Sequence, residues 1–260
     1  MHFLKPIIWI ALVIGHLAYG PTSWAGTPLV AAASDLKFAL EEIAASYRTE
    51  TRNDVKLTFG SSGTLYQQIR QGAPFEIFFS ADEGFVDQLV ASKFALNSGE
   101  LYAIGRVVLF APRGSNLKID AEGVGLREAM ARGLIERFAI ANPEHAPYGR
   151  AAEQALRKMG LWDAIKPKLV LGENVSQAAQ FATSGSAQGG ILAYSLVLSP
   201  ALKNLGTHVL IPSEWHSPLR QKMVLLRSAG PEANSFYRYV GNTSSRAILR
   251  RYGFILPGEQ

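Results

Sequence analysis

Hydrophobic positions along the chain switch repeatedly between two periods. Short apolar or alternating runs, typical of strands, occur at residues 29–33, 55–59, 75–79, 107–110, 138–141, 169–171, 190–193, 208–211 and 223–226. Between the runs, apolar residues recur at three- and four-residue spacing, as in Leu36, Leu40 and Ile43. This repeated strand–helix alternation predicts an α/β fold with mostly parallel sheets.

Two stretches interrupt the alternation and suggest how the chain divides. The first is Ala111-Pro-Arg-Gly-Ser-Asn116, and the second runs from Pro212 to Pro218. We therefore expect one lobe built from residues 26–110 plus 217–260 and a second built from residues 111–216. A chain of this length is compatible with two such lobes.

The first 25 residues have the pattern of a secretory signal peptide. Lys5 is followed by an apolar run at residues 7–19 and then by Ser23-Trp-Ala25, a site with small residues at cleavage spacing. We expect cleavage near Ala25-Gly26 and a periplasmic protein. The alternative, a membrane anchor, is disfavoured because the run is too short to span a bilayer and contains Gly15 and His16.

Composition narrows the function classes. The chain has no cysteine, which excludes disulfides and a cysteine-linked lipid anchor. Removing residues 1–25 removes only Lys5, so the formal charge falls from +5 to +4. The basic residues are scattered, which argues against nucleic-acid binding. There is no Walker A motif, and the five histidines lack the spacing of a zinc site, so no cofactor is expected.

Small polar residues stand where several predicted strands give way to helices. These junctions are Ser34-Asp35, Gly60-Ser-Ser-Gly-Thr64, the segment from Asn142 to Gly149, and Gly172-Glu-Asn-Val-Ser176. Helix N-termini carry free N–H groups and partial positive charge, and ligands of open α/β sheets bind at the carboxyl ends of the strands. Each junction alone could be an ordinary cap or turn, but together they indicate an anion site.

The chain resembles the periplasmic molybdate-binding proteins of ABC importers, the ModA family. The matching stretches follow one another through nearly all of the exported chain: Ala31-Ala-Ala-Ser34, Gly60-Ser-Ser-Gly-Thr64, Gly72-Ala-Pro-Phe75, Phe79-Ser-Ala-Asp82, Asn142-Pro-Glu-His-Ala-Pro-Tyr-Gly149, Glu173-Asn-Val175 and Arg251-Tyr-Gly-Phe254. The resemblance implies a two-lobed periplasmic binding protein (type II) fold, with a hinge that lets the lobes close over the ligand.

The resemblance also implies a set of ligand residues. Ser34 and Ser62 would donate hydroxyl and backbone N–H groups, and Tyr148 and Val175 would donate backbone N–H groups only. Ser61 ranks below Ser62. We expect Asp35 to cap the helix that begins near Leu36 and to offer only its N–H.

One departure concerns the tyrosine hydroxyl that many members of the family use. In Gly190-Ile-Leu-Ala-Tyr194 the tyrosine falls one residue late, which favours Ala193 facing the ligand and Tyr194 pointing away. Tyr194 stays a lower-ranked candidate ligand, and the sequence leaves open which of the two faces the anion. A subgroup with the Ala-Pro-Tyr-Gly form found here lacks that tyrosine.

The expected function is capture of molybdate, and of the similarly sized tungstate, by neutral donors. These anions are fully deprotonated near neutral pH and accept hydrogen bonds only, whereas phosphate would need an acceptor for its proton. The protein would pass the anion, as a monomer without catalysis, to an ABC permease with its ATPase. The alternatives are a receptor for sulfate or thiosulfate and an exported hydrolase that uses Ser62 with His145 and Asp82.

Overall fold

The fold consists of two five-stranded sheets, each covered by helices. The computed structural model describes residues 26–259, so the predicted signal peptide lies outside the described residues. The first sheet has the order β2-β1-β3-β10-β4 and the second the order β7-β6-β8-β5-β9. The strands are β1 (Leu29–Ala33), β2 (Lys56–Gly60), β3 (Ile77–Ser80), β4 (Glu100–Gly105), β5 (Val107–Pro112), β6 (Phe138–Ala141), β7 (Leu169–Gly172), β8 (Gly189–Ala193), β9 (Gly206–Leu210) and β10 (Leu219–Leu225).

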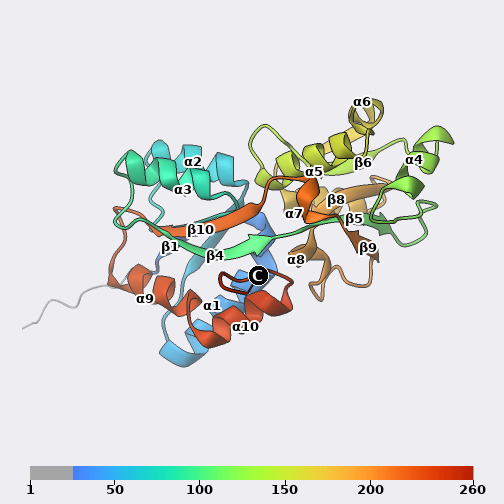
Figure 1. Cartoon of the computed structure of the whole chain (residues 1–260). Helices are drawn as coiled ribbons and strands as arrows, with labels where there is room; N and C mark the ends of the chain where they lie inside the picture. Colours follow the sequence, from blue (N-terminus) through green and yellow to red (C-terminus); the bar gives the residue numbers. More distant parts are fainter. Residues whose placement is uncertain (1–25, 260) are drawn as a thin grey trace, which may run out of the picture.

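Helices follow most of the strands directly. The α-helices are α1 (Lys37–Thr51), α2 (Ser62–Arg70), α3 (Glu83–Ala91), α4 (Val124–Ala131), α5 (Pro147–Lys158), α6 (Trp162–Ile165), α7 (Val175–Thr183), α8 (Tyr194–Val197), α9 (Pro231–Val240) and α10 (Thr243–Arg251). Three 3-10 turns accompany them: η1 (Ser34–Leu36), η2 (Lys166–Lys168) and η3 (Ser213–Trp215). In Figure 1, α2 and α3 cover one face of the first sheet, and α1, α9 and α10 lie on the other side.

Each sheet is mixed, with one strand running against its neighbours. In the first sheet β10 pairs antiparallel with β3 and β4, while β1 pairs parallel with β2 and β3. In the second sheet β5 pairs antiparallel with β8 and β9, while β6 pairs parallel with β7 and β8. The predicted α/β class with two lobes is therefore confirmed. The strands that precede the predicted ligand-side junctions, β1, β2, β6 and β7, form the parallel pairs β1–β2 and β6–β7.

The chain passes between the lobes at two places. β4 ends the first lobe's contribution at Gly105, and β5 begins at Val107 in the second sheet. The chain returns between η3 and β10, that is, between Trp215 and Leu219. The first crossing thus precedes the expected boundary at residue 111, because Pro112 marks the end of a strand inside the second lobe.

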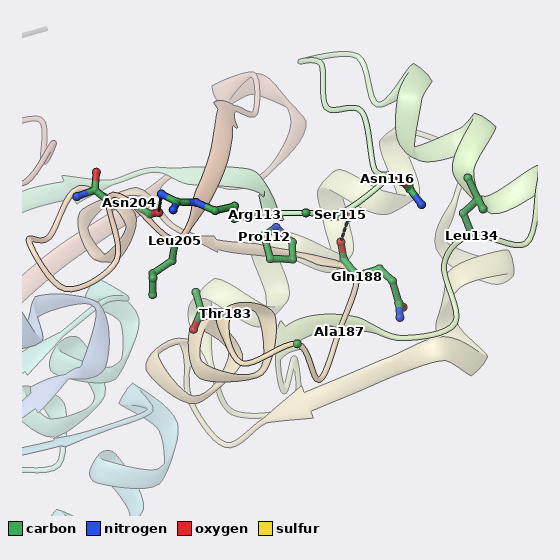
Figure 2. A pocket seen from close by; sticks show the side chains of 12 residues that line it. Pro112, Arg113, Ser115, Asn116, Leu134, Thr183, Ala187, Gln188, Asn204 and Leu205 are labelled. Atoms are coloured by element: carbon green, nitrogen blue, oxygen red, sulfur yellow. Dashed lines mark hydrogen bonds between the residues drawn. The ribbon is translucent and has the colours of Figure 1, made fainter.

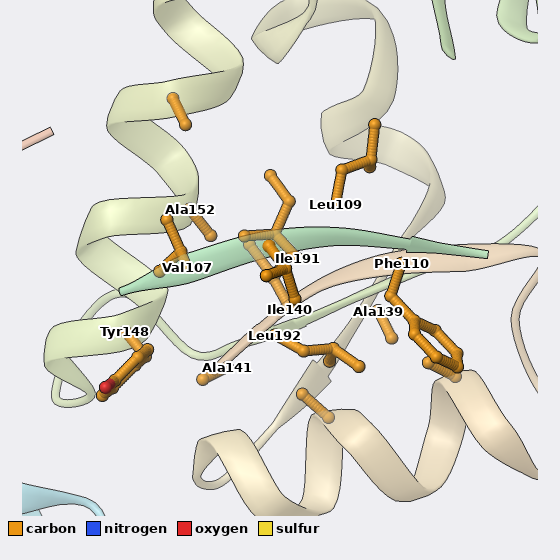
Figure 3. Close-up of a cluster of buried hydrophobic side chains, with 14 of the residues drawn as sticks. Val107, Leu109, Phe110, Ala139, Ile140, Ala141, Tyr148, Ala152, Ile191 and Leu192 are labelled. Carbon is orange, nitrogen blue, oxygen red and sulfur yellow. The ribbon is translucent and has the colours of Figure 1, made fainter. Parts of the chain in front are cut away.

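The core of the second lobe explains why β5 belongs there. Val107, Val108, Leu109 and Phe110 are all buried, and their side chains alternate between the two faces of the sheet. Figure 3 shows Leu109 and Phe110 pointing to opposite faces, toward helices on either side. A strand that buries both faces needs a helix layer on each, and in the second lobe α5 and α7 pack against β5.

Candidate functional site

Four predicted donor residues come together around one small cavity between the lobes. Ser34 begins the turn after β1, Ser62 is the first residue of α2, Tyr148 is the second residue of α5, and Val175 is the first residue of α7. All four line a cavity of about 10 Å³. Three of these residues stand in the first turn of helices of nine or more residues, whose free N–H groups therefore face the cavity.

Each lobe supplies half of this set, and direct hydrogen bonds join the halves. The Gly63 N–H donates to the His145 carbonyl at 3.0 Å, and the Ser176 hydroxyl donates to the Ser34 carbonyl at 2.8 Å. At the rim, the Arg150 guanidinium lies 2.6 Å from the Asp82 carboxylate. The lobes are therefore closed over the cavity, which has room for only a very small guest.

The hydroxyls of Ser34 and Ser62 are held as acceptors by the protein. Ser62 Oγ accepts from the Ala81 N–H at 2.9 Å, and Ser34 Oγ accepts from the Ser176 N–H at 3.3 Å. Ser62 is fully buried. Because a hydroxyl that accepts one bond still has its own hydrogen to give, both serines are oriented to donate to a ligand that only accepts.

Ser61 lines the same cavity but is engaged elsewhere. It is the N-cap of α2, where its Oγ accepts from the Thr64 N–H at 3.2 Å. The same Oγ lies 2.8 Å from Thr64 Oγ1 and 2.8 Å from His145 Nδ1. Ser61 thus shapes the helix end and joins the lobes.

The expectation for the Asp35 side chain is wrong. Asp35 lies inside the turn η1, whose N-cap is Ala33, and α1 begins after Leu36 without a side-chain cap. Its carboxylate instead accepts from Gln221 Nε2 at 2.6 Å and from the Tyr148 hydroxyl at 3.0 Å. Its second oxygen, Oδ1, is buried without a hydrogen-bond partner.

Burial of Asp35 changes its acidity. Loss of solvent raises the pKa of this carboxyl to about 6, although the hydrogen bonds from Gln221 and Tyr148 act in the opposite direction. Burial and the neighbouring Asp35 charge also raise the pKa of Tyr102 and Tyr148 well above the usual value, so both phenols remain protonated donors.

Tyr194 lies away from the cavity. Its ring packs 4.6 Å from the Arg106 guanidinium and 5.6 Å from the His208 ring, beside Gly253. Ala193 is fully buried at the end of β8. Neither residue is among those that line the cavity, which are Ala33, Ser34, Asp35, Gly60, Ser61, Ser62, Ala81, Ala146, Pro147, Tyr148 and Val175.

The residues of the alternative hydrolytic triad do not form a relay. Ser62 Oγ bonds to the backbone of Ala81, and the imidazole of His145 reaches Ser61 instead. The carboxylate of Asp82 caps α3 through the Gly84 N–H and pairs with Arg150. A nucleophile without a base in reach has no means of activation.

The cavity lining has no cationic side chain and one carboxyl group, that of Asp35. Within residues 26–259 no three His, Cys, Asp or Glu side chains gather as a metal site would require, and no helix is long and apolar enough to cross a membrane. What the cavity presents is a set of neutral N–H and O–H groups at fixed helix ends, and such groups bind anions.

A larger cavity of about 440 Å³ lies in the second lobe, remote from the four donors. Figure 2 shows it between the loop of Arg113 and Ser115 and the segments of Thr183, Gln188 and Asn204. Two of its polar side chains are tied to backbone: Arg113 donates to the Asn204 carbonyl at 2.6 Å, and Ser115 donates to the Gln188 carbonyl at 2.8 Å. The N-termini of α2, α5 and α7 do not line it, so the smaller cavity is the candidate site.

Comparisons with known proteins agree with this geometry. The chain is 34% identical over 89% of its length to the molybdate-binding protein ModA of Rhodobacter capsulatus, and 32% identical over 89% to that of Escherichia coli; the matches cover 89% and 90% of those proteins. The solved periplasmic molybdate-binding protein of Azotobacter vinelandii is 32% identical, with a TM-score of 0.81 over 88% of this chain and 99% of that one.

A more distant structure shows how widely the fold is shared. The sulfate-binding protein SubI of Mycobacterium tuberculosis superposes with a TM-score of 0.71 at 12% identity, covering 89% of this chain and 88% of that one. Such a likeness concerns the fold alone. Residues 28–255 match the profile of a family described as bacterial extracellular solute-binding protein. The chain therefore belongs to the bacterial extracellular solute-binding proteins.

Proposed function

We propose that the protein captures molybdate, and also tungstate, and delivers the bound anion to an ABC importer. One observation carries the proposal: two serine hydroxyls, three helix N-termini and the 3-10 turn of Ser34 converge on a closed cavity whose lining has no cationic side chain. The relatives named for molybdate support the same ligand.

The donor set fits a fully deprotonated tetrahedral dianion. Each hydroxyl already accepts one bond from the protein, so its hydrogen is directed toward a ligand that accepts. Helix N-terminal N–H groups spread the compensating charge without needing Lys or Arg. Charge and shape are alike for sulfate and molybdate, so the size of the cavity would select between them.

We also propose where the protein acts and which partners it has. The protein is exported with cleavage near Ala25-Gly26, acts in the periplasm as a monomer without a cofactor, and catalyses no reaction. Its partners are the anion and a membrane permease with its ATPase. Release at the permease would require the lobes to open, since hydrogen bonds join them across the cavity.

Titration calorimetry on the protein purified from a periplasm tests the ligand. We expect tight, saturable binding of molybdate and tungstate with one anion per chain, and weak or no heat with sulfate and thiosulfate. Strong binding of sulfate with none of molybdate would replace this proposal by the other oxyanion receptor. The mass of the same sample checks the cleavage site.

A further inference from the structure

A buried polar cluster beside the cavity joins four side chains from four distant parts of the chain. Gln221 of β10 is its centre and is fully buried. Gln221 Oε1 accepts from the Tyr102 hydroxyl at 2.6 Å, and Nε2 donates to Asp35 Oδ2 at 2.6 Å and to the Tyr148 hydroxyl at 3.2 Å. The Tyr148 hydroxyl in turn donates to Asp35 Oδ2 at 3.0 Å.

The cluster crosses from one lobe to the other at a single residue. Tyr102, Asp35 and Gln221 belong to the first sheet or to the turn that follows β1, whereas Tyr148 belongs to α5 of the second lobe. The hydroxyl of Tyr148 therefore meets its partners only while the lobes are together. Its backbone N–H, at the start of α5, is one of the donors at the cavity.

The cluster also lies directly on the hinge. Gly105 ends β4, where the chain first leaves the first lobe, and it pairs with Leu219 of the returning strand β10. A Cβ atom at Gly105 would stand 2.2 Å from the Tyr148 hydroxyl oxygen and 2.6 Å from Gln221 Nε2. The hinge therefore has no side chain at the point where the Tyr148 hydroxyl enters the first lobe.

We propose that Gln221 is a positioning residue that holds the Tyr148 hydroxyl, and with it the N-terminus of α5, in the closed form, and so determines how slowly the bound anion leaves. This inference rests on the proposed function of the cavity. Gln221 does not line the cavity and acts through Tyr148 and Asp35.

The physical reason is the cost of burying polar groups without partners. Closure takes the Tyr148 hydroxyl and the Asp35 carboxylate out of water, and Gln221 Nε2 donates a hydrogen bond to both. Without its amide, the closed form keeps the burial and loses the bonds, whereas the open form can return the Tyr148 hydroxyl to water. The closed form is thus selectively weakened, and anion release accelerates while capture by the open form is little changed.

The test compares release rates of molybdate from the full exported protein and three variants. Gln221→Leu removes the amide, and Tyr148→Phe removes the cross-lobe hydroxyl while keeping the backbone N–H. Tyr237→Phe is the control, because Tyr237 is a buried tyrosine of the first lobe whose hydroxyl donates to the Met223 carbonyl within that lobe. Stopped-flow exchange against excess tungstate gives the dissociation rate, and rapid mixing gives the association rate.

We expect both site variants to release the anion about tenfold faster, corresponding to about 1.4 kcal/mol, with association changed by less than about threefold. The double variant should be only slightly faster than either single one, because both changes break the same cluster. The control should match the original protein. The inference is overturned if the dissociation rate of Tyr148→Phe equals that of the original protein, or if the association and dissociation rates change by the same factor.

The outcomes separate this inference from the proposed function. If the original protein binds sulfate and not molybdate, the proposed ligand is wrong, and the same comparison is made with sulfate. If Gln221→Leu does not fold, Tyr148→Phe decides, since it deletes one oxygen atom. Small-angle X-ray scattering of the ligand-saturated variants provides a second measurement: we expect a larger fraction of open molecules in both site variants than in the control.

Discussion

At the residue scale, the site uses two kinds of donor that respond differently to mutation. In the proposed site Ser34 and Ser62 would give hydroxyl groups, which a substitution can remove, whereas Tyr148 and Val175 would give backbone N–H groups, which most substitutions leave in place. The identity of the side chain at 148 and 175 therefore matters less for direct contact than that at 34 and 62.

Replacing Ser62 with alanine should weaken molybdate binding by about 1–3 kcal/mol, the usual contribution of a hydrogen bond to a charged group. Calorimetry measures this loss. Ser199→Ala is the matched control, because Ser199 is equally buried but its hydroxyl donates to the Leu196 carbonyl within the second lobe. Equal affinity in Ser62→Ala and the original protein would remove this hydroxyl from the site.

Asp35 should link anion binding to proton uptake. Opening separates this carboxyl from Tyr148 of the other lobe and admits water, so its pKa should move toward the usual 3.8, whereas burial in the closed form holds the pKa at about 6. Between these values the closed form binds more protons, so affinity should fall as the pH rises from about 4 to 6. A bound dianion adds negative charge and acts in the same direction.

Calorimetry at pH 5.5 in two buffers of different ionisation enthalpy detects this proton. The apparent enthalpy of tungstate binding should differ between the buffers for the original protein and agree for Asp35→Asn. Identical enthalpies for the original protein would show that Asp35 does not change its protonation on closure.

The residues at strand ends could be predicted because a junction is local in sequence, as Ser34 and Ser62 illustrate. The role of Asp35 could not, because its partners Tyr148 and Gln221 lie 113 and 186 positions away. A signal for Gln221 was nevertheless present. It is a polar residue at a buried position of an alternating strand, Leu219–Leu225, and such a residue needs a partner.

At the scale of elements, the buried apolar runs predicted strands correctly, whereas some other elements were not predicted. The apolar runs at residues 107–110 and 138–141 are buried strands, as predicted. β4 (Glu100–Gly105) was not predicted, although Leu101 to Ile104 form a short apolar run; it lies at the edge of its sheet. Helix α4 (Val124–Ala131) was also missed, because Gly123 at its start has φ of 70° and no helix-forming signal of its own.

Helix α4 depends on a cap that lies outside it. Asp120 accepts from the Val124 N–H at 2.8 Å and from the Gly125 N–H at 2.7 Å. Slight burial raises the pKa of Asp120, but these backbone N–H groups outweigh it and lower the pKa overall. Asp120→Ala should reduce the free energy of unfolding by about 1 kcal/mol in urea titrations at neutral pH.

The pH dependence of this cap has a definite sign. Because the pKa is lower in the folded protein, the contribution of Asp120 is complete above the unfolded value of 3.8 and is lost as the pH falls through the folded value. The difference in unfolding free energy between the original protein and Asp120→Ala should therefore shrink toward pH 3. Asp120→Asn, which keeps an acceptor but no charge, should lie between the two.

At the scale of the whole molecule, closure brings backbone against backbone. A Cβ atom at Gly63 would stand 2.5 Å from the His145 carbonyl oxygen of the other lobe. Since His145 is across the cleft, this clash exists only when the lobes are together. Glycine at this position is required by the closed form, and the open form can accommodate alanine.

Gly63→Ala should therefore fold normally but bind molybdate more weakly, by tenfold or more. The added methyl group would keep the backbone at position 63 from approaching the His145 carbonyl as closely as in the closed form. Small-angle X-ray scattering with saturating anion should report a more open molecule than the original protein. Gly241→Ala is the control, since its added Cβ would meet only the Arg238 carbonyl at an ordinary 3.4 Å. A fully closed Gly63→Ala would contradict this reading of the cleft.

The division of the four donors between the lobes has a consequence for affinity. Each lobe can be regarded as a weak binding module carrying half of the hydrogen bonds, and the two crossings near Gly105 and Trp215 as the tether between modules. Once one half holds the anion, the second half binds within the same molecule, at an effective concentration that the tether determines. Lengthening either crossing by a few flexible residues should then weaken capture although every donor is kept, so tether length is as much a part of the site's affinity as Ser34 or Ser62.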